Sequence, residues 1–371
     1  MCGIICSSVV IAVGAILVVG SCVLSFVFVP EIIKNVIKGE VVLINDTIQM
    51  ERFETVPFAL RFSVRLFNLT NPDAVMTGGV PVLEEVGPYV YQLYQTRELK
   101  DMADDKVWYL RHEHFEFDPI ASFPNKESDM VTIVNVPYNA IIQVAENMVP
   151  NLMFLFNQML DGVFGDYNSP IATFNVRDLL FDGIPLCKDA GATAMIACSI
   201  IKQIGESSMN IEELEDGSLT FAILEYKDRY PSLLYEVNRG LSEPTLLGDI
   251  IRYNESSYFN YWTPYSDTEP GVCNMINGTD SGIFRPFVDR TKSIYAINTD
   301  ICRSVELRYQ YDTEYEGIPT VRYSANEWLF DNDEGCFCLN VTKGHTREDG
   351  CLLKGAMELF TCVGKYLPLF F

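Results

Sequence analysis

Basic residues are scarce in this chain of 371 residues, which has 27 lysines and arginines against 50 aspartates and glutamates, a net charge of -23. A protein that binds nucleic acid needs lysine and arginine to displace the counterions of the phosphate backbone. The same acidic excess disfavours docking on an anionic membrane surface. The composition therefore argues against nucleic acid as a partner and is typical of a solvated, acidic exterior.

Histidine is rarer still, and familiar catalytic motifs are missing. The three histidines are His112, His114 and His345, and no nucleophile elbow, dinucleotide-binding loop, phosphate-binding loop or His-Glu-x-x-His helix occurs. His112 and His114 lie two residues apart, so on a strand they share a face, as zinc ligands do. A zinc ectoenzyme is one hypothesis and a polar sheet face the other. The second is favoured, and we expect no enzyme, catalytic residue, metal or cofactor.

Charged residues are absent from residues 4–29. At ~1.5 Å per residue, a helix of this length exceeds the ~30 Å hydrocarbon core, so it can cross a bilayer with some tilt. A cleaved signal peptide fits less well, because no lysine or arginine precedes the run. We predict a short cytoplasmic segment at residues 1–3, a transmembrane helix at 4–29 and an ectodomain at 30–371. Glu31 to Ile37 are expected to continue the helix past Pro30.

Lysines and cysteines disagree on the orientation of this helix. Lys34 and Lys38 follow the span, and the positive-inside rule would place them in the cytoplasm. Eight cysteines of the second half indicate an oxidising compartment instead, and so do five glycosylation sequons, at Asn45, Asn68, Asn254, Asn277 and Asn340. We give two lysines less weight and expect an extracellular ectodomain at the plasma membrane. Cys2 and Cys6 are then cytoplasmic, as sites of palmitoylation or as unmodified thiols.

The spacing of the eight ectodomain cysteines does not choose their pairing. They are Cys187, Cys198, Cys273, Cys302, Cys336, Cys338, Cys351 and Cys362. Cys336 and Cys338 point the same way on an extended chain but rarely reach disulfide torsion with each other. Each is expected to bond a different partner, and a thiolate metal site is the alternative.

Strand patterns dominate the ectodomain. Residues 80–93 are β-branched and aromatic with a break at Gly87-Pro88, residues 107–117 alternate, and residues 218–226 alternate after an Asp-Gly turn. Helices are predicted at residues 138–148, with an apolar stripe including Ile141 and Ala145, and after Asn151. The sequence therefore predicts an α+β fold with a mostly antiparallel sheet or barrel.

The helix after Asn151 has no polar face over more than a turn. It contains five large apolar residues in succession, from Leu152 to Phe156. Such a helix is either buried all round or exposes an apolar patch with a purpose. Both interpretations stay open at this point. The candidate lipid-contact residues are Leu152, Phe154, Leu155, Phe156 and Met159.

Ordered motifs over most of the chain resemble the class B scavenger receptor family, which includes fatty acid translocase and a lysosomal integral membrane protein. They comprise Leu66 to Pro72, Glu85 to Tyr91, Phe117 to Pro119, Asn135 to Pro137, Cys273 to Asp280 with Phe284, Pro286 and Phe287, Asp300 to Ser304, and Gly317 to Pro319. Residues 176–183, from Val176 to Gly183, look most like the insect sensory neuron membrane proteins.

The resemblance implies an irregular antiparallel β-barrel core, an apical helical bundle at about residues 138–182, and an apolar tunnel that carries lipids toward the membrane. It also implies three disulfides: Cys273 with Cys336, Cys302 with Cys362, and Cys338 with Cys351. Cys187 and Cys198 would then pair locally. The family continues past the position of Phe371 to a second membrane helix, so we expect the barrel to be incomplete at its C-terminal end.

The function implied by the resemblance is receptor-type lipid binding. We expect the ectodomain to bind a fatty-acid-derived pheromone or odorant and to pass it to membrane lipids or to a neighbouring odorant receptor. The alternative is a scavenger receptor for lipoprotein-like particles or fatty acids. Some family members carry apical lysines that capture fatty acids, and none matches in residues Asp166 to Ile171. This departure favours neutral ligands.

Overall fold

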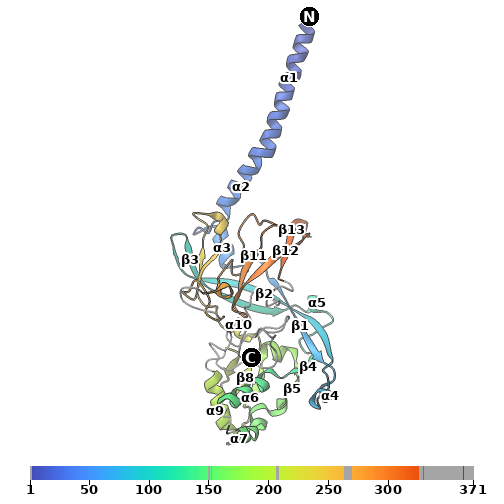
Figure 1. The fold of residues 1–371 in the computed structure, drawn as a ribbon, viewed down its shortest axis with the longest axis vertical. Helices are drawn as coiled ribbons and strands as arrows, with labels where there is room; N and C mark the ends of the chain where they lie inside the picture. Colours follow the sequence, from blue (N-terminus) through green and yellow to red (C-terminus); the bar gives the residue numbers. More distant parts are fainter. Residues whose placement is uncertain are drawn as a thin grey trace.

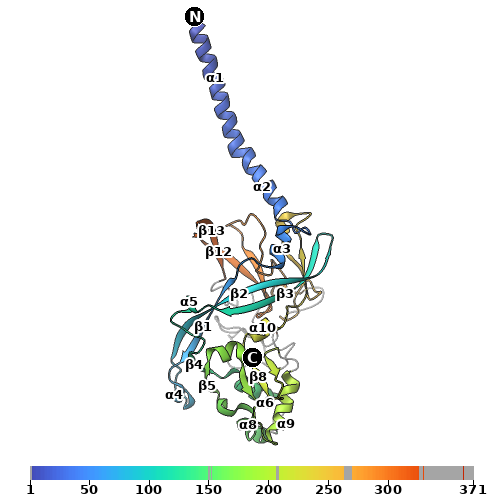
Figure 2. The same ribbon diagram turned by 180° about the vertical axis from the view of Figure 1, so that it is seen from behind.

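The computed structural model describes residues 2–148, 151, 153–205, 209–262, 270–325, 329 and 362. Three parts follow one another along the long axis of the molecule. A single long helix projects from one end, a layer of strands forms the middle, and a helix-rich part forms the opposite end (Figures 1 and 2). The described chain therefore separates its N-terminal helix from its helical bundle by the full depth of the sheet layer.

The N-terminal helix runs without a break through three segments: α1 (Cys2–Val23), the π-helical η1 (Leu24–Phe28) and α2 (Val29–Glu40). Pro30 has no N–H to donate to the preceding turn, and a wider π turn is a common way to absorb such a lost bond. Within the described residues this is the one helix long and apolar enough to cross a membrane, and it is not buried against the protein. The predicted continuation past Pro30 is confirmed.

The main sheet has five antiparallel strands in the order β1-β2-β3-β9-β10. Their bounds are β1 Leu60–Leu69, β2 Leu83–Ala103, β3 Lys106–Phe117, β9 Tyr235–Asn238 and β10 Ile250–Tyr253. Alternate residues of β2, including Tyr89, Tyr91 and Leu93, are buried on its concave face. The strands curl into a half-barrel (Figure 2). A closed barrel, as the resemblance implied, is not formed by the described strands.

Gly87 and Pro88 do not break β2, contrary to the prediction from sequence. The strand starts later than expected, at Leu83, and then passes through both residues to Ala103. Opposite them the register with β1 shifts between Val64 and Leu66, so an extra residue is absorbed as a bulge. Gly87 has a φ of 116°, which only glycine adopts freely. A proline and a glycine therefore mark a bulge here, not a strand end.

Residues 218–226 are only partly the predicted strand. β8 covers Leu219–Phe221, and the chain then turns into the short helix α10 (Glu225–Arg229). All three β8 residues are buried, because β8 is the central strand of the small sheet β6-β8-β7 (β6 Ile184–Leu186, β7 Ile211–Glu213). The alternation read from the sequence therefore does not reflect a solvent face.

The remaining strands form a three-stranded sheet of β11 (Ile294–Asn298), β12 (Arg303–Tyr315) and β13 (Ile318–Ser324), and the pair β4 (Met130–Val134) with β5 (Ile171–Asn175). Short helices connect the strands: α3 Ile48–Glu54, α4 Pro72–Met76, α5 Pro119–Ser122, η5 Pro244–Leu246 and η6 Val272–Asn274. Asp118 caps α5 by accepting from the N–H groups of Ile120 and Ala121.

The helical end consists of α6 (Val136–Met148), α7 (Met153–Asn157), α8 (Leu160–Phe164), η3 (Gly165–Tyr167), η4 (Asp178–Asp182) and α9 (Ala194–Gly205). Ile141 and Ala145 of α6 are buried, as the predicted stripe requires. One continuous apolar core joins these helices to the concave face of the sheet at Tyr91 and Phe115. The bundle reaches beyond the predicted residues 138–182, because α9 packs on α8.

Candidate functional site

The end of the molecule farthest from the N-terminal helix is formed by α6, α7, α8 and α9 (Figures 1 and 2). If α1 crosses a membrane, this end points away from it. We call it the apex.

Helix α7 divides the predicted lipid-contact residues into two groups. The side chains of Phe154 and Leu155 are 78% and 43% exposed, whereas Phe156 and Met159 are buried in the apical core. Leu152 lies outside the described residues. The prediction of a lipid-contact surface therefore fits only Phe154 and Leu155 among the described residues, because Phe156 and Met159 pack in the core of the bundle.

Helix α9 contributes a second apolar face that sequence reasoning missed. Met195, Ile196 and Ile200 are exposed, while Ala197 and Ile201 on the other side are buried in the core. The two sides follow helical periodicity, so the signal was present in the sequence. We define the apical apolar surface as the exposed side chains of α7 and α9: Phe154, Leu155, Met195, Ile196 and Ile200.

One covalent bond and one close packing contact hold α9 in place. Cys187 and Cys198 form a disulfide that ties the first part of α9 to the end of β6. Gly162 of α8 lies so close to Ala194 that an added Cβ would come within 2.4 Å of the Ala194 Cβ. The part of the apical apolar surface on α9 is therefore held by a cross-link to the end of β6 and by close packing on α8.

The apex also contains lysines, although none falls between Asp166 and Ile171. Lys188, between β6 and α9, is exposed, and Lys202 on α9 lies 2.5 Å from Glu213. A neutral ligand was expected from the missing lysine alone. Lys202 is paired, and no lysine falls between Asp166 and Ile171, so the neutral ligand stays a prediction.

A polar cleft of about 350 Å³ lies where the apex meets the sheet. Its charged side chains are already paired. Arg229 pairs with Glu212 and with Glu225 at 2.6 Å, and Nδ1 of His114 lies 3.0 Å from Asp228. The hydrogen bond to Asp228 raises the pKa of His114. The cleft thus links β3, α10 and the small sheet by ion pairs and offers no unpaired charge to a ligand among these residues.

The histidine pair does not form a metal site in the described part of the chain. His112 lies 3.2 Å from Glu98, whereas His114 turns to Asp228. No group of three or more histidine, cysteine, aspartate or glutamate side chains placed to hold a metal occurs among the residues that the structure describes. His345 lies outside them. The zinc hypothesis loses its geometric support here.

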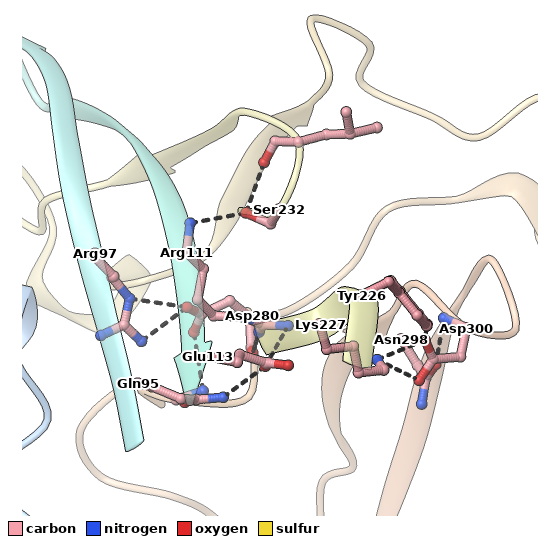
Figure 3. Close-up of polar contacts among 12 residues, drawn as sticks. Gln95, Arg97, Arg111, Glu113, Tyr226, Lys227, Ser232, Asp280, Asn298 and Asp300 are labelled. Carbon is pink, nitrogen blue, oxygen red and sulfur yellow. Dashed lines mark hydrogen bonds and ion pairs between the residues drawn. The ribbon is translucent and has the colours of Figure 1, made fainter. Parts of the chain in front are cut away.

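An ionic cluster in the interior of the sheet was not predicted. Arg97 donates to Oδ2 of Asp280 from Nε and Nη2, at 3.0 and 2.8 Å (Figure 3). Tyr109 donates to the same oxygen at 2.9 Å. Arg111 donates to the Asp280 carbonyl at 2.7 Å and pairs with Glu113. Burial raises the pKa of Asp280, but Arg97 and Arg111 outweigh it and hold that pKa below its usual range.

This cluster is structural, because its central pair, Arg97 and Asp280, is bonded away from solvent. The Arg97 and Asp280 side chains are essentially inaccessible. They join β2 and β3 to the loop after η6, which the sequence places far away. Residues at such separation give no local signal, so sequence reasoning had no means of pairing them.

The disulfides and sequons can now be placed. The structure bonds Cys302 to Cys362 as well as Cys187 to Cys198, the pairs expected from sequence, and Cys273 is also disulfide-bonded. Cys336, Cys338 and Cys351 lie outside the described residues, as does Asn340. Asn45 and Asn254 are exposed and Asn68 and Asn277 half-buried. Cys2 and Cys6 fall in α1, so their palmitoylation remains a prediction.

Comparison with known proteins agrees with this architecture of one apolar anchor helix and a disulfide-bonded, mixed α and β ectodomain. Residues 12–371 match the CD36 family. The chain is 32% identical to sensory neuron membrane protein 2 of Drosophila melanogaster, covering 96% of this chain and 74% of that protein. The corresponding protein of Heliothis virescens is 34% identical, over 90% and 64%. Sensory neuron membrane protein 1 of Manduca sexta is 29% identical, over 95% and 65%.

The chain therefore belongs to the CD36 family and is a membrane protein. It spans between about two thirds and three quarters of the length of the relatives named above. These relatives carry the names of membrane proteins of sensory neurons, and none of the three carries the name of an enzyme.

Proposed function

We propose that this protein is a membrane receptor or co-receptor that takes up long-chain, fatty-acid-derived ligands at the apical apolar surface. From there the ligand passes along the ectodomain to the bilayer or to a neighbouring odorant receptor. The observation that supports this proposal is the exposure of Phe154, Leu155 and Ile196 on two helices at the end opposite the anchor. Large apolar side chains gathered on one face of a soluble domain usually mark an interaction site.

The relatives supply the context for the ligand class. Their names place them in sensory neurons, and this fits a pheromone or odorant of low water solubility as the ligand. Burial of an alkyl chain would drive binding, because each methylene gains ~0.8 kcal/mol on leaving water. A chain of about fourteen methylenes gives on the order of 11 kcal/mol before the costs of immobilisation. The proposed ectodomain lies outside the cell, where disulfides form.

The test uses the full chain in nanodiscs and a radiolabelled long-chain aldehyde as the probe. Phe154→Asp places a charge on the exposed face of α7 without entering the core, so the bundle should still fold. Because burying a phenyl side chain is worth about 1.5–3 kcal/mol, we expect the Kd to rise about tenfold or more. Ile196→Asp, on the exposed face of α9, should act in the same direction.

The matched control is Ile120→Asp. Ile120 is even more exposed than Phe154 but lies at α5, beside the sheet and away from the apex. Its substitution should leave the Kd unchanged. If Phe154→Asp and Ile196→Asp bind the aldehyde as wild type does, or if Ile120→Asp weakens binding equally, the apex is not the entry. Phe156→Asp is unsuitable because Phe156 is buried.

A further inference from the structure

The hairpin of β12 and β13 ends on the side of the ectodomain from which α2 emerges. Figures 1 and 2 show its tip at the same end of the ectodomain as the base of that helix, far from α7 and α9. Glu316 and Gly317 form the turn, and both have positive φ, 49° and 81°. This is the conformation of a tight two-residue hairpin turn, so the tip is a defined structure and not an open loop.

The two faces of this hairpin differ in charge. Tyr315 pairs with Ile318 and Thr313 with Thr320, and Tyr311, which pairs with Arg322, follows on the same face. Asp312 and Glu314 occupy the alternate positions and therefore point to the other face. The tip thus has one acidic face and one face of tyrosine, threonine and isoleucine, which is uncharged over its two outer pairs and has Arg322 only at the third.

The uncharged face is strongly exposed. Tyr315, Ile318 and Tyr311 have 70%, 63% and 58% of their surface accessible. A second exposed apolar group lies on the same side of the ectodomain: Leu241 and Leu246 belong to the loop at η5, and η5 contacts α2. Tyrosine is enriched at membrane–water interfaces, where its ring meets the acyl boundary and its hydroxyl meets water.

The anchor places a bilayer next to this face. The apolar run of residues 4–29 is about 39 Å long as a helix, longer than the ~30 Å hydrocarbon core, and such a helix tilts. Tilting lowers one side of an attached domain toward the headgroups. Helix α2 also exposes Ile32, Ile33 and Val36, so it can lie against the interface as the domain tilts.

We infer that the uncharged face of the β12–β13 hairpin rests on the headgroup region of the bilayer. The ectodomain then has a second membrane contact in addition to α2. The partner is a zwitterionic lipid surface. Glu314 and Glu316 lie at the tip and the whole chain carries a charge of -23, so an anionic surface would repel it. The hairpin then sets the tilt of the ectodomain, which the helix alone leaves free.

The test places tryptophan probes in the full chain in nanodiscs of phosphatidylcholine that is brominated on its acyl chains. Tyr315→Trp is conservative on an exposed ring, and its emission is measured as the difference from wild type. We expect brominated lipid to remove about half of the emission added by Trp at position 315, since interfacial rings reach the acyl boundary. Nanodiscs with phosphatidylserine should give weaker quenching.

Two controls make the result decisive. Phe154→Trp puts the probe at the apex, where quenching should be absent, and Glu314→Trp puts it on the other face of the same hairpin, where quenching should be weaker than at 315. Far-UV circular dichroism verifies the fold of each variant. Equal quenching at positions 315 and 154, or no quenching at position 315, would overturn the proposed contact of the hairpin with the bilayer. Equal quenching at 314 and 315 overturns the one-sided contact, and stronger quenching with phosphatidylserine overturns the choice of a zwitterionic surface.

Discussion

Asp280 shows how this fold tolerates charge in its interior. Its carboxylate accepts hydrogen bonds from Arg97, from Tyr109 and from the Gly282 N–H at 2.9 Å. Removing one partner of a buried ion pair is far more costly than the pair's net contribution to stability, because the remaining charge stays desolvated. The cluster therefore makes the packing of the loop after η6 against β2 and β3 highly specific.

Gly282 is the residue on which this arrangement depends sterically. An added Cβ would lie 2.3 Å from Nη2 of Arg97 and 3.2 Å from Oε1 of Gln95. Arg97 cannot swing aside, because Nη2 is bonded to Asp280 and Nη1 to the Phe53 carbonyl. We expect Gly282→Ala to lower the free energy of unfolding by about 2–3 kcal/mol. Thermal unfolding of the oxidised, detergent-solubilised chain measures the change.

Gly191→Ala is the control for the loss of a glycine as such. Gly191 has no atom within 4 Å of its virtual Cβ, so the substitution should leave the unfolding midpoint near that of wild type. If Gly282→Ala unfolds at the same temperature as Gly191→Ala, the guanidinium of Arg97 is not held as tightly as its hydrogen bonds indicate.

Residue-level predictions from sequence succeeded where the signal was local. The end of β3 at Phe117 and the buried stripe of α6 follow from spacing within a few residues. Arg97 and Asp280 are separated by 183 positions, and the alternation of β2 gives Arg97 no mark that distinguishes it from a surface arginine. Their pairing arises only when β2, β3 and the loop after η6 are folded together.

Among the elements, α8 and α9 meet at a close contact that depends on a single residue, Gly162. Gly162 allows the approach, since its position faces Ala194, the first residue of α9. Gly162→Ala should force the helices apart by the width of a methyl group and lower the free energy of unfolding by about 1–2 kcal/mol, less the gain in helix propensity. The same unfolding assay measures it.

A compensating substitution identifies the cause of this loss. Ala194→Gly removes the methyl group that the new Cβ of residue 162 would meet, so the double variant should regain most of the lost stability. Ala194→Gly alone should cost only a few tenths of a kcal/mol to about 1 kcal/mol, the propensity difference at a helix start. A double variant less stable than Gly162→Ala would show that the two methyl groups do not compete for the same space.

The predictions from sequence were wrong about where two strands, β2 and β8, begin or end. Gly87 and Pro88 normally punctuate a strand, yet β1 pairs with β2 on both sides of them and keeps the strand intact. Residues 218–226 alternate, yet tertiary contacts bury both faces of β8 and turn the next residues into α10. In each case neighbouring elements decided the outcome, and a pattern within one segment cannot record them.

At the scale of the whole molecule, the class of the fold could be predicted, but the exposed apolar residues of the apex could be predicted only in part. The anchor helix, the antiparallel sheet and the apical bundle were expected. Phe156 and Met159 were assigned to the ligand and belong to the core, because an apolar run without polar residues does not reveal which side faces inward. In the proposed entry site, the exposed residues of α9 (Met195, Ile196 and Ile200) take the place of Phe156 and Met159.

The orientation of the anchor decides whether the apex can meet an extracellular ligand at all. Lys34 and Lys38 favour a cytoplasmic ectodomain by the positive-inside rule. The disulfides Cys187–Cys198 and Cys302–Cys362 favour the opposite side, because thiols stay reduced in the cytoplasm. Two lysines provide a small bias, whereas two bonded pairs are typical of an oxidising compartment.

The sequon at Asn254 tests this orientation independently of the cysteines. Asn254 is exposed, and Ser256 completes its acceptor motif. In cells, Ser256→Ala should remove one glycan and speed migration on a gel, whereas Ser256→Thr should keep the glycan and migrate as wild type. Because glycans are added only on the luminal side of the membrane, this difference would place the ectodomain outside the cell. If glycosidase treatment changes the mobility of none of the three proteins, the result supports the orientation that Lys34 and Lys38 favour, with the apex in the cytoplasm.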